Sequence, residues 1–379
     1  MECYNAMKGY FLYGEMKLDD KQNLNGIDKK VKSQILSLNT KNIKCTQLCF
    51  PREIYNLWYK LKIRCPFFNL GPKWIYYSEF DDMDFLYFRR PQFFSGYLIK
   101  LLKIIKKNNP NAKILLEIPT YPYDKELKVR WIDYFFFLKD KMNRNKLYRY
   151  VDRLVTMDDS NVIFKIPTIK IMNGINVTDI AVVESSREDR DTIHIIMVAM
   201  FSVWHGVDRF LKGLGIYYQN GGRRNIVLHL VGKINGGLMR EYIHIINKYF
   251  INNHVIFHGE VYGQELDFIY NKCRLGLVSF GTHRKNIFKL STLKSREYLA
   301  KGLPMISSGQ TDVFERTNFQ YNLECPSDES PIDMEKVISF FDEIYRDDVA
   351  VVVDRIRRFA LENIDIHVTM LPVIDYLKS

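Results

Sequence analysis

Residues 276–308 read GLVSFGTHRKNIFKLSTLKSREYLAKGLPMISS and contain the pattern that decides the fold. The apolar run at 275–279 predicts a buried strand. Ser291 and Thr292 stand directly before a helical pattern at 293–300, where hydroxyl side chains cap helix starts. Gly302 is placed to end that helix, and the apolar residues after it begin another short strand. A strand, a capped helix and a second strand in this order indicate a parallel α/β sheet.

The same stretch predicts an anion site at the start of its helix. The first amides of a helix have no partner within it, and the helix dipole places partial positive charge there. Lys294 and Arg296 lie in the first turns and add charge of the same sign. Glu297 lies one turn inside, where a carboxylate can accept hydrogen bonds from sugar or ribose hydroxyls. A phosphate beside a hydroxyl-rich group is the arrangement found in a nucleotide-sugar.

The composition excludes several classes of protein. The chain has 379 residues, 47% hydrophobic and 14% aromatic, which is enough for two domains with real cores and excludes a disordered chain. No apolar run approaches the roughly 20 residues that cross a bilayer, and residues 1–17 lack the layout of a signal peptide. The six cysteines form no CxxC pair, so we expect no zinc site or disulfide framework, and a reducing cytosol is the expected compartment.

The positive charge is concentrated in the first half. Residues 1–150 hold 28 Lys and Arg against 15 Asp and Glu, a balance of 28−15=+13, and the remainder holds 27 against 29, a balance of −2. Such a surface attracts anionic lipids, diphosphates or nucleic acid, and it is also compatible with an ordinary solvated face. The helical pattern at 126–147 combines aromatic residues with basic neighbours, so it predicts either a membrane-surface helix or a core helix with solvated flanks.

Short apolar strands alternate with amphipathic helices along both halves. This alternation predicts an α/β protein with two Rossmann-like domains, 1–180 and 181–360, followed by a C-terminal helix at 361–379. The predicted strands are 9–13, 44–49, 74–77, 85–88, 113–117, 153–157, 169–172, 193–199, 226–231, 255–257, 275–279 and 304–306. The predicted helices are 27–38, 93–107, 126–147, 207–218, 238–249, 264–273 and 293–300, with a helical region from 332 to the end.

The segment SREYLAKGLPMIS resembles the donor-binding segment of the GT-B glycosyltransferases, in particular the retaining family 4 enzymes. Their common form has two glutamates separated by seven residues, followed by A-x-A-x-G-x-P-V-I. Glu297 matches the second glutamate, whereas Lys289 occupies the position of the first. LKSREYLAKGLP, the upstream HRK and the segment LEIPTYPYDKE are similar to a bacterial polysaccharide-assembly branch. The resemblance implies two domains facing a cleft, with the C-terminal helix crossing back to the first domain.

The resemblance also implies a set of donor-binding residues in the second half. VAMFSVWHGVDRFLKGL resembles the family segment whose arginine and lysine grip the donor diphosphate, but those positions hold Met200 and His205. A neutral imidazole supplies less charge than lysine, so we expect other cations to compensate, although His205 is also compatible with a packed loop histidine. The implied donor-binding residues are His205, Gly232, Glu260, Val261, Arg284, Lys285, Ser291, Thr292, Leu293, Lys294 and Glu297.

Two places in the first half are expected to face the acceptor. Gly26 lies at a strand-to-helix turn, where a ligand can approach the backbone closely, although an ordinary turn fits equally well. The loop after the strand at 113–117 follows the carboxyl end of a buried strand, where open α/β sheets bind ligands. The candidates there for orienting an acceptor hydroxyl are Glu117, Thr120, Tyr121 and Asp124, and a proline-stiffened connector is the alternative.

These features together predict a glycosyltransferase of the retaining, metal-independent type. It would move a sugar from a UDP- or GDP-sugar to a glycan or lipid-linked diphosphate acceptor in cell-surface polysaccharide synthesis. We expect no cofactor, a cytoplasmic location with peripheral contact to an anionic membrane, and no nucleic-acid partner. The sequences at 82–84 and 189–191 have the DxD spacing of metal-binding transferases of another fold, and we expect both to be solvated loops.

Three alternatives remain open at the level of sequence. A nucleotide-sugar epimerase of the same architecture is disfavoured because all eight histidines lie at or beyond residue 194 and the first half lacks paired carboxylates. A nucleic-acid-binding protein would use the basic half, but no signature of a nucleic-acid-binding fold is visible. A catalytically inactive sugar-nucleotide binder would follow from Lys289 in place of the glutamate.

Overall fold

The computed structural model describes residues 7–14, 17–20, 24–50, 63, 74–124, 127, 134–184, 191–315, 317 and 319–379. The chain divides into two compact units. The first comprises Met1–Met172 with Ile366–Ser379, and the second comprises Asn173–Asp365. The unit boundary therefore lies between Met172 and Asn173, earlier than the position 180 expected from the sequence. The C-terminal segment belongs to the first unit.

The first unit is built on a mostly parallel sheet with the strand order β2-β1-β3-β4-β5-β7-β6. Apolar side chains fill the strands because both faces of the sheet are covered. Only the pairing of β6 with β7 is antiparallel among the described strands. The strands are β1 (Met7–Leu12), β2 (Ile43–Leu48), β3 (Phe85–Arg89), β4 (Lys113–Ile118), β5 (Arg153–Thr156), β6 (Val162–Ile163) and β7 (Ile166–Lys170).

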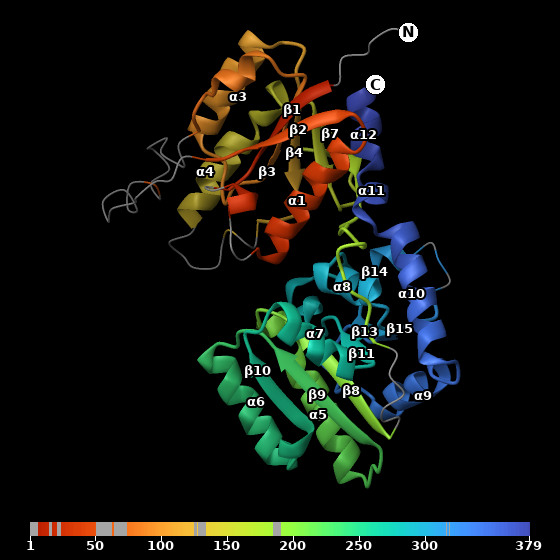
Figure 1. Cartoon of the computed structure of the whole chain (residues 1–379). Coiled ribbons are helices and arrows are strands. Elements are labelled where there is room, and N and C mark those ends of the chain that lie inside the picture. The colour runs from red at the N-terminus through yellow and green to blue at the C-terminus, as the bar shows by residue number, and fades with distance from the viewer. Residues whose placement is uncertain are drawn as a thin grey trace. The chain divides into compact units, whose positions relative to one another are not determined.

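Helices cover both faces of this sheet (Figure 1). On one face α1 (Gly26–Asn39), α11 (Ile366–Thr369) and α12 (Leu371–Lys378) bury Val31, Met370 and Ile374. On the other face α3 (Gly96–Asn108) and α4 (Tyr134–Arg144) bury their apolar sides. Short 3-10 turns occur at η1 (Leu18–Asp20), η2 (Ser78–Asp81) and η5 (Leu147–Arg149).

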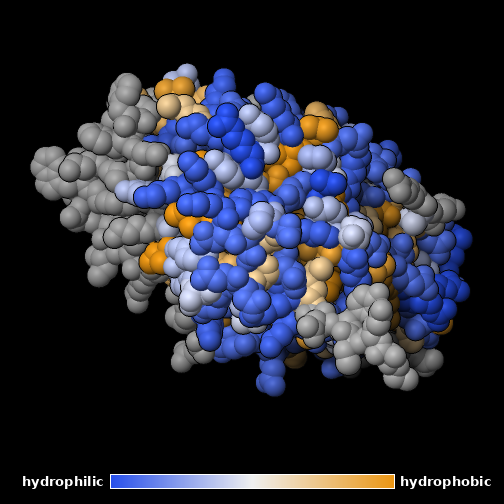
Figure 2. All heavy atoms as spheres, turned by 90° about the horizontal axis from the view of Figure 1, so that it is seen from above, coloured by the Kyte–Doolittle hydropathy of each residue, from blue (hydrophilic) through white to orange (hydrophobic). Residues whose placement is uncertain are grey.

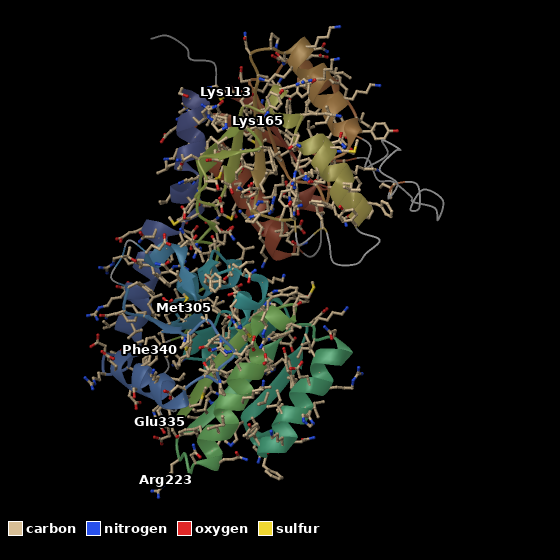
Figure 3. The ribbon with its side chains drawn as sticks, turned by 180° about the vertical axis from the view of Figure 1, so that it is seen from behind. Lys113, Lys165, Arg223, Met305, Glu335 and Phe340 are labelled. Carbon is tan, nitrogen blue, oxygen red and sulfur yellow. The ribbon has the colours of Figure 1, made fainter. Side chains whose placement is uncertain are left out.

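The C-terminal helix is fixed to the first unit by a basic side chain. Lys113, labelled beside α12 in Figure 3, donates to the last carbonyls of that helix, Tyr376 O at 3.0 Å and Leu377 O at 2.9 Å. A cation at the carboxyl end of a helix also complements its dipole. Arg153 lies over the Tyr376 ring at 4.7 Å. The sheet of the first unit thus holds the helix that ends the chain.

The second unit contains a parallel sheet with the order β10-β9-β8-β11-β13-β15. Its strands are β8 (Thr192–Val198), β9 (Asn225–Val231), β10 (Val255–Gly259), β11 (Leu275–Leu277), β13 (Met305–Ser308) and β15 (Asn322–Cys325). A separate two-stranded sheet joins β12 (Lys289–Leu290) to β14 (Gln310–Thr311). Because all these pairings are parallel, the loops after the strands collect at one edge, where such sheets bind ligands.

In the described part of the second unit, six longer helices accompany the sheet. They are α5 (Val207–Gln219), α6 (Gly236–Tyr249), α7 (Gly263–Lys272), α8 (Leu293–Lys301), α9 (Met334–Ile344) and α10 (Val349–Asn363). The 3-10 turns are η6 (Val203–His205), η7 (Asn252–His254), η8 (Thr282–Lys285) and η9 (Asp312–Phe314). Helices α7 and α8 are joined by an ion pair between Lys301 and Asp267 at 2.6 Å, and Gly302 at the end of α8 packs on Val353 of α10.

Most of the predicted elements are present, with a few corrections. The predicted strand at 74–77 is wrong, because these residues form no strand and lead into η2 instead. The hairpin strand β6 and the edge strand β15 were missed, because both are short and carry no clear alternation. The predicted helix at 126–147 corresponds to α4, which runs from Tyr134 to Arg144, and residues 126 and 128–133 of that prediction lie outside the described residues.

Figure 2 looks onto the molecule from above and shows hydrophilic side chains over most of this face, with small separate apolar patches. Within the described parts of the chain, no helix combines the length and apolar character needed to cross a bilayer.

Candidate active site

The start of α8 has the features of an anion site. Thr292 is the N-cap, and its hydroxyl accepts a hydrogen bond from the Ser295 amide at 3.3 Å. The amides of Leu293 and Lys294 have no acceptor among the described residues. These two N–H groups lie at the positive end of the helix dipole. The predicted capping of this helix is therefore confirmed, and two donors remain available to a ligand.

Lys294 places an unneutralised ammonium group at this helix start. Its Nζ is shielded from solvent and has no hydrogen-bond partner among the described residues. Burial lowers the pKa of Lys294 from 10.5 to about 7. A buried cation without a counter-ion is costly, and an anionic ligand would relieve that cost. The side chain is therefore poised for an anion such as a diphosphate.

His205 lies close to Lys294 and is neutral. The side chain is buried, and its Nδ1 accepts a hydrogen bond from the Ser202 amide at 2.9 Å. Burial, together with the charges of Lys294 and Lys285, lowers the pKa of His205 to about 3. Because Nδ1 accepts, the single proton of the neutral ring is on Nε2, which is a donor. His205 therefore offers a hydrogen bond rather than a charge, and the charge at this place comes from Lys294, whose pKa of about 7 leaves it partly protonated at neutral pH.

Arg296 anchors the segment that precedes α8. This arginine is fully buried and donates through Nε to the Asn173 carbonyl at 2.8 Å. Its guanidinium also pairs with Asp312 and reaches the Ser291 hydroxyl. Ser291 in turn accepts from the Asn173 side chain through its carbonyl at 3.0 Å. Arg296 and Ser291 thus fix the backbone at the helix start, and the predicted contact of Ser291 with a donor stays a prediction.

Glu297 lies in the second turn of α8, half-buried beside two tyrosines. Its charge contributes, after burial, to raising the pKa values of Tyr270 and Tyr298. Tyr298 donates to the carbonyl of Leu277 at 3.1 Å, which ties α8 to the neighbouring strand β11. The carboxylate is thus held one turn inside the helix, as the sequence predicts, and its contact with ribose hydroxyls stays a prediction.

The two other predicted cations are engaged within the second unit. Arg284 pairs with Asp208 at 2.9 Å and with Glu329 at 2.6 Å. The hydrogen bonds with Glu329 and Asp208 raise the pKa of Arg284. The Lys285 ammonium lies 3.2 Å from the centre of the Trp204 ring. The roles of Arg284 and Lys285 as diphosphate ligands stay predictions. Arg284 would have to break its ion pairs with Asp208 and Glu329 in order to bind a diphosphate.

Three backbone candidates lie at the ends of β9 and β10. Gly232 has a φ of +122°, and an added Cβ would lie 2.0 Å from the Ala199 carbonyl, so the close approach of another loop requires glycine here. Glu260 is exposed and Val261 half-buried directly after β10. Both positions are at the carboxyl edge of the sheet, where the sequence predicts them.

The replacement at position 289 is accompanied by a carboxylate. The Lys289 ammonium in β12 lies 2.8 Å from Glu315, which follows η9. The place where the resemblance implies a glutamate therefore holds a lysine–glutamate pair rather than a lone cation.

The residues of the first unit that the sequence predicts to face the acceptor differ in how deeply they are buried. Gly26 is exposed in the first turn of α1, next to a capping box between Asn25 and Asp28. Glu117 is fully enclosed at the end of β4, and its carboxylate is bonded to side chains of its own unit. Thr120 and Tyr121 are half-buried in the following loop.

Asp124, in that same loop, pairs with Arg144 of α4 at 2.6 Å. None of the four side chains proposed for orienting the acceptor is tested by these contacts, so their roles stay predictions.

The described residues contain no group of three His, Cys, Asp or Glu side chains arranged to hold a metal ion. Asp82 of the first DxD sequence pairs with Lys8 at 2.8 Å. Asp84 accepts from the Lys8 amide at 2.7 Å. Asp189 and Arg190 of the second DxD sequence lie outside the described residues.

Sequence reasoning missed the residues that surround Glu117. They are Lys30, Gln34, Tyr87 and Arg89. A signal was present: Lys30 and Gln34 are spaced by one helical turn on α1, and Arg89 directly ends a buried strand. Only the fold shows that α1 brings this pair over β3 and β4.

The sequence matches no protein-family model, and no characterised protein matches it significantly in sequence. In structure the chain is similar to a sucrose-phosphate synthase from Thermosynechococcus elongatus, with a TM-score of 0.62, 13% identity and coverage of 98% of this chain and 99% of the other. HepE from Anabaena in complex with UDP-glucose gives a TM-score of 0.61 at 13% identity, with the same coverages.

A glycosyltransferase from Rickettsia africae gives a TM-score of 0.58 at 12% identity, with coverage of 99% of this chain and 98% of the other. The chain has the GT-B fold. The predicted fold class of two Rossmann-like domains is thereby confirmed, whereas membership of family 4 stays a prediction.

Proposed function

We propose that this protein is a glycosyltransferase that takes its sugar from a nucleotide-sugar bound at the start of α8. The observation that carries the proposal is the Lys294 ammonium, which is shielded and has no partner among the described residues, beside two available helix amides. A diphosphate supplies the missing negative charge and accepts from the amides. The complex of HepE, a protein of the same fold, with UDP-glucose supports this class of donor.

The same groups would assist the departure of the nucleoside diphosphate. Negative charge develops on the leaving phosphate during transfer, and preorganised amides and cations stabilise it. Lys294, the amides of Leu293 and Lys294, and His205 Nε2 are the donors offered here. We propose that these groups act without a metal ion and that transfer proceeds with retention, which requires little beyond positioning of the two substrates.

The acceptor is proposed to be a lipid-linked or glycan molecule at an anionic membrane. Helices α3 and α4 are neighbours, joined by the Asn143 side chain to the Phe94 carbonyl at 3.2 Å. Their outer faces carry exposed basic and apolar residues, which suit an anionic lipid surface. These residues are Tyr97, Lys100, Lys103, Lys107, Tyr134, Phe135, Lys141 and Met142.

The test of the donor site uses calorimetric titration with UDP-glucose and with GDP-mannose. We expect one of them to bind the wild-type chain, and Lys294→Met to weaken that binding roughly 30-fold or more, because a buried charge partner is lost. Lys336→Met on the exposed side of α9 is the matched control and should bind normally. Equal binding by Lys294→Met and the wild type would refute the site.

A catalytically inactive sugar-nucleotide binder is the second candidate, because Lys289 stands where the resemblance implies a glutamate. The two candidates differ in turnover. Slow hydrolysis of the bound donor without an acceptor, measured by release of UDP or GDP, supports the transferase. Tight donor binding with neither hydrolysis nor transfer to a lipid-diphosphate acceptor supports the inactive binder.

The membrane proposal is tested by co-sedimentation with vesicles. Binding to vesicles rich in phosphatidylglycerol but not to phosphatidylcholine vesicles is expected, and reversal of Lys100, Lys103 and Lys141 to glutamate should abolish it. Equal binding to both vesicle types, or preferential binding to an oligonucleotide, would contradict the assignment.

A further inference from the structure

A buried polar cluster lies at the carboxyl end of β3 and β4 in the first unit. Arg89 and Glu117 are register partners on these neighbouring strands, so their side chains project from the same face. Helix α1 covers that face and contributes Lys30 and Gln34. Tyr87, two residues before Arg89, lies beneath them and donates to Glu117 at 2.7 Å. Strand and helix therefore bring five polar groups into one enclosed place.

Glu117 is saturated by its neighbours. Its Oε1 lies 3.1 Å from Lys30 and 3.5 Å from Arg89. Its Oε2 accepts from Gln34 at 2.8 Å and from Tyr87. Burial alone would raise the pKa of Glu117, but the charges of Lys30 and Arg89 and the two hydrogen bonds lower it to about 2. The carboxylate thus serves to hold the two cations in place.

The cluster contains more positive than negative charge. Two cations, with side chains 3% and 12% exposed, share one carboxylate. Asp28 of α1 accepts from the Tyr13 hydroxyl at 2.8 Å and from the Asn25 amide at 3.2 Å. Asp28 therefore completes the start of its own helix rather than pairing with Arg89. Glu117 is thus the carboxylate that Lys30 and Arg89 share.

Arg89 carries an unused donor at this place. Its Nη1 is shielded from solvent and has no hydrogen-bond partner among the described residues. Buried guanidinium donors are rarely left unpaired, because a buried donor without an acceptor has lost its hydrogen bonds to water and gained none in return. The position is the carboxyl edge of an open parallel sheet, where ligands bind. An anion would satisfy the unused donor.

We propose that Arg89, steadied by Glu117, anchors a second anion subsite that takes a phosphate or diphosphate group of the acceptor. This inference rests on the proposed function, because a transferase needs an acceptor site apart from the donor site at α8. Arginine suits the task, since its planar fork binds two phosphate oxygens at once. Lys30 adds a second positive charge beside it, and Glu117 is a positioning residue that fixes both cations.

The test is a calorimetric titration of the full chain with inorganic pyrophosphate after saturation with UDP. With the donor site filled, we expect one further binding event in the wild type. Arg89→Gln should weaken it at least about tenfold, the equivalent of one charge-assisted hydrogen bond. Arg149→Gln, on the exposed side of the same unit, is the matched control and should leave it unchanged.

A second variant keeps the test independent of folding. Arg89→Lys keeps the charge beside Glu117 but loses the fork, so it should fold normally and weaken pyrophosphate binding less than Arg89→Gln does. Absence of a second binding event in UDP-saturated wild type, or equal binding by all four proteins, would overturn the subsite. If UDP itself does not bind, the proposed function fails instead, and titration of the free chain still reports on Arg89.

Discussion

Lys294 and Glu117 show two opposite ways of keeping a charge inside a protein. Lys294 has no counter-ion among the described residues, and burial lowers its pKa to about 7. Glu117 has two cations and two further donors, and its pKa falls to about 2. Burial makes the charged form of Lys294 unfavourable, and a bound anion would make it favourable again. Glu117 is satisfied internally and serves to position other residues.

Removing the charge of Glu117 should destabilise the first unit. Glu117→Gln removes the carboxylate that Lys30 and Arg89 share, so the free energy of unfolding should fall by about 3–5 kcal/mol. Urea denaturation followed by circular dichroism measures this change. Glu343→Gln, on the exposed side of α9, serves as the control. A change of less than about 0.5 kcal/mol, the range of an ordinary surface substitution, would show that the cluster adds no stability.

At the scale of elements, two side chains fix the start of α8: Thr292 caps the helix and Arg296 anchors it. The Thr292 hydroxyl accepts from the Ser295 amide, and Arg296 is bound to Asn173 and Asp312. The two amides between these fixed points are thereby left available to a ligand. A preorganised site of this kind loses little entropy when the ligand binds.

Loss of the cap should weaken both the helix and the site. Thr292→Ala should lower the free energy of unfolding by about 1 kcal/mol and weaken UDP-glucose binding by a few-fold, because the first turn frays. Thr292→Ser retains the hydroxyl and should behave like the wild type in both measurements. If Thr292→Ala had the same free energy of unfolding and the same affinity for UDP-glucose as the wild type, the cap would not order the helix start.

The sequence predicted the elements far better than the contacts between them. Helix α8 and its cap follow from Ser291, Thr292 and Gly302, because local residue types decide where a helix begins and ends. The failure at 74–77 shows the limit: apolar and aromatic residues indicated a strand, but Trp74 packs on Phe50 and Phe88 as a loop residue. The Lys289–Glu315 and Arg89–Glu117 pairs join residues distant in sequence, so only the fold shows that their side chains meet.

At the scale of the whole molecule, the two units differ in how acid affects them. In the second unit, burial together with the charges of His194 and His258 lowers the pKa of His229 to about 4. Its ring bonds both of those histidines, at 2.9 and 3.0 Å. The pKa of His205 is lowered further, to about 3, chiefly by burial. In the first unit, the charges of Lys30 and Arg89 and two hydrogen bonds hold the pKa of Glu117 at about 2 in spite of its burial.

These shifts predict that the second unit loses stability first as the pH falls. The unfolded histidines bind protons below about pH 6.5 while the folded ones stay neutral, so stability decreases from that pH down to the folded values. Glu117 is ionised in both states until the pH falls below about 4.5, so its contribution is lost only from there downward. Pulse proteolysis in urea at about pH 7 and pH 5, with fragments identified by mass, separates the units. His229→Gln should reduce the effect, and an equal loss in both units would contradict this prediction.

The central claim is that the Lys294 ammonium binds the diphosphate of an activated sugar, and proton uptake tests it most directly. At about pH 8 the free Lys294 is mostly neutral, and a bound diphosphate would restore its proton. UDP-glucose is the suitable ligand because its diphosphate does not titrate in this range. Calorimetric titration in two buffers of different ionisation enthalpy should show uptake of nearly one proton for the wild type and almost none for Lys294→Met. Normal binding of UDP-glucose by the wild type without proton uptake would contradict the account.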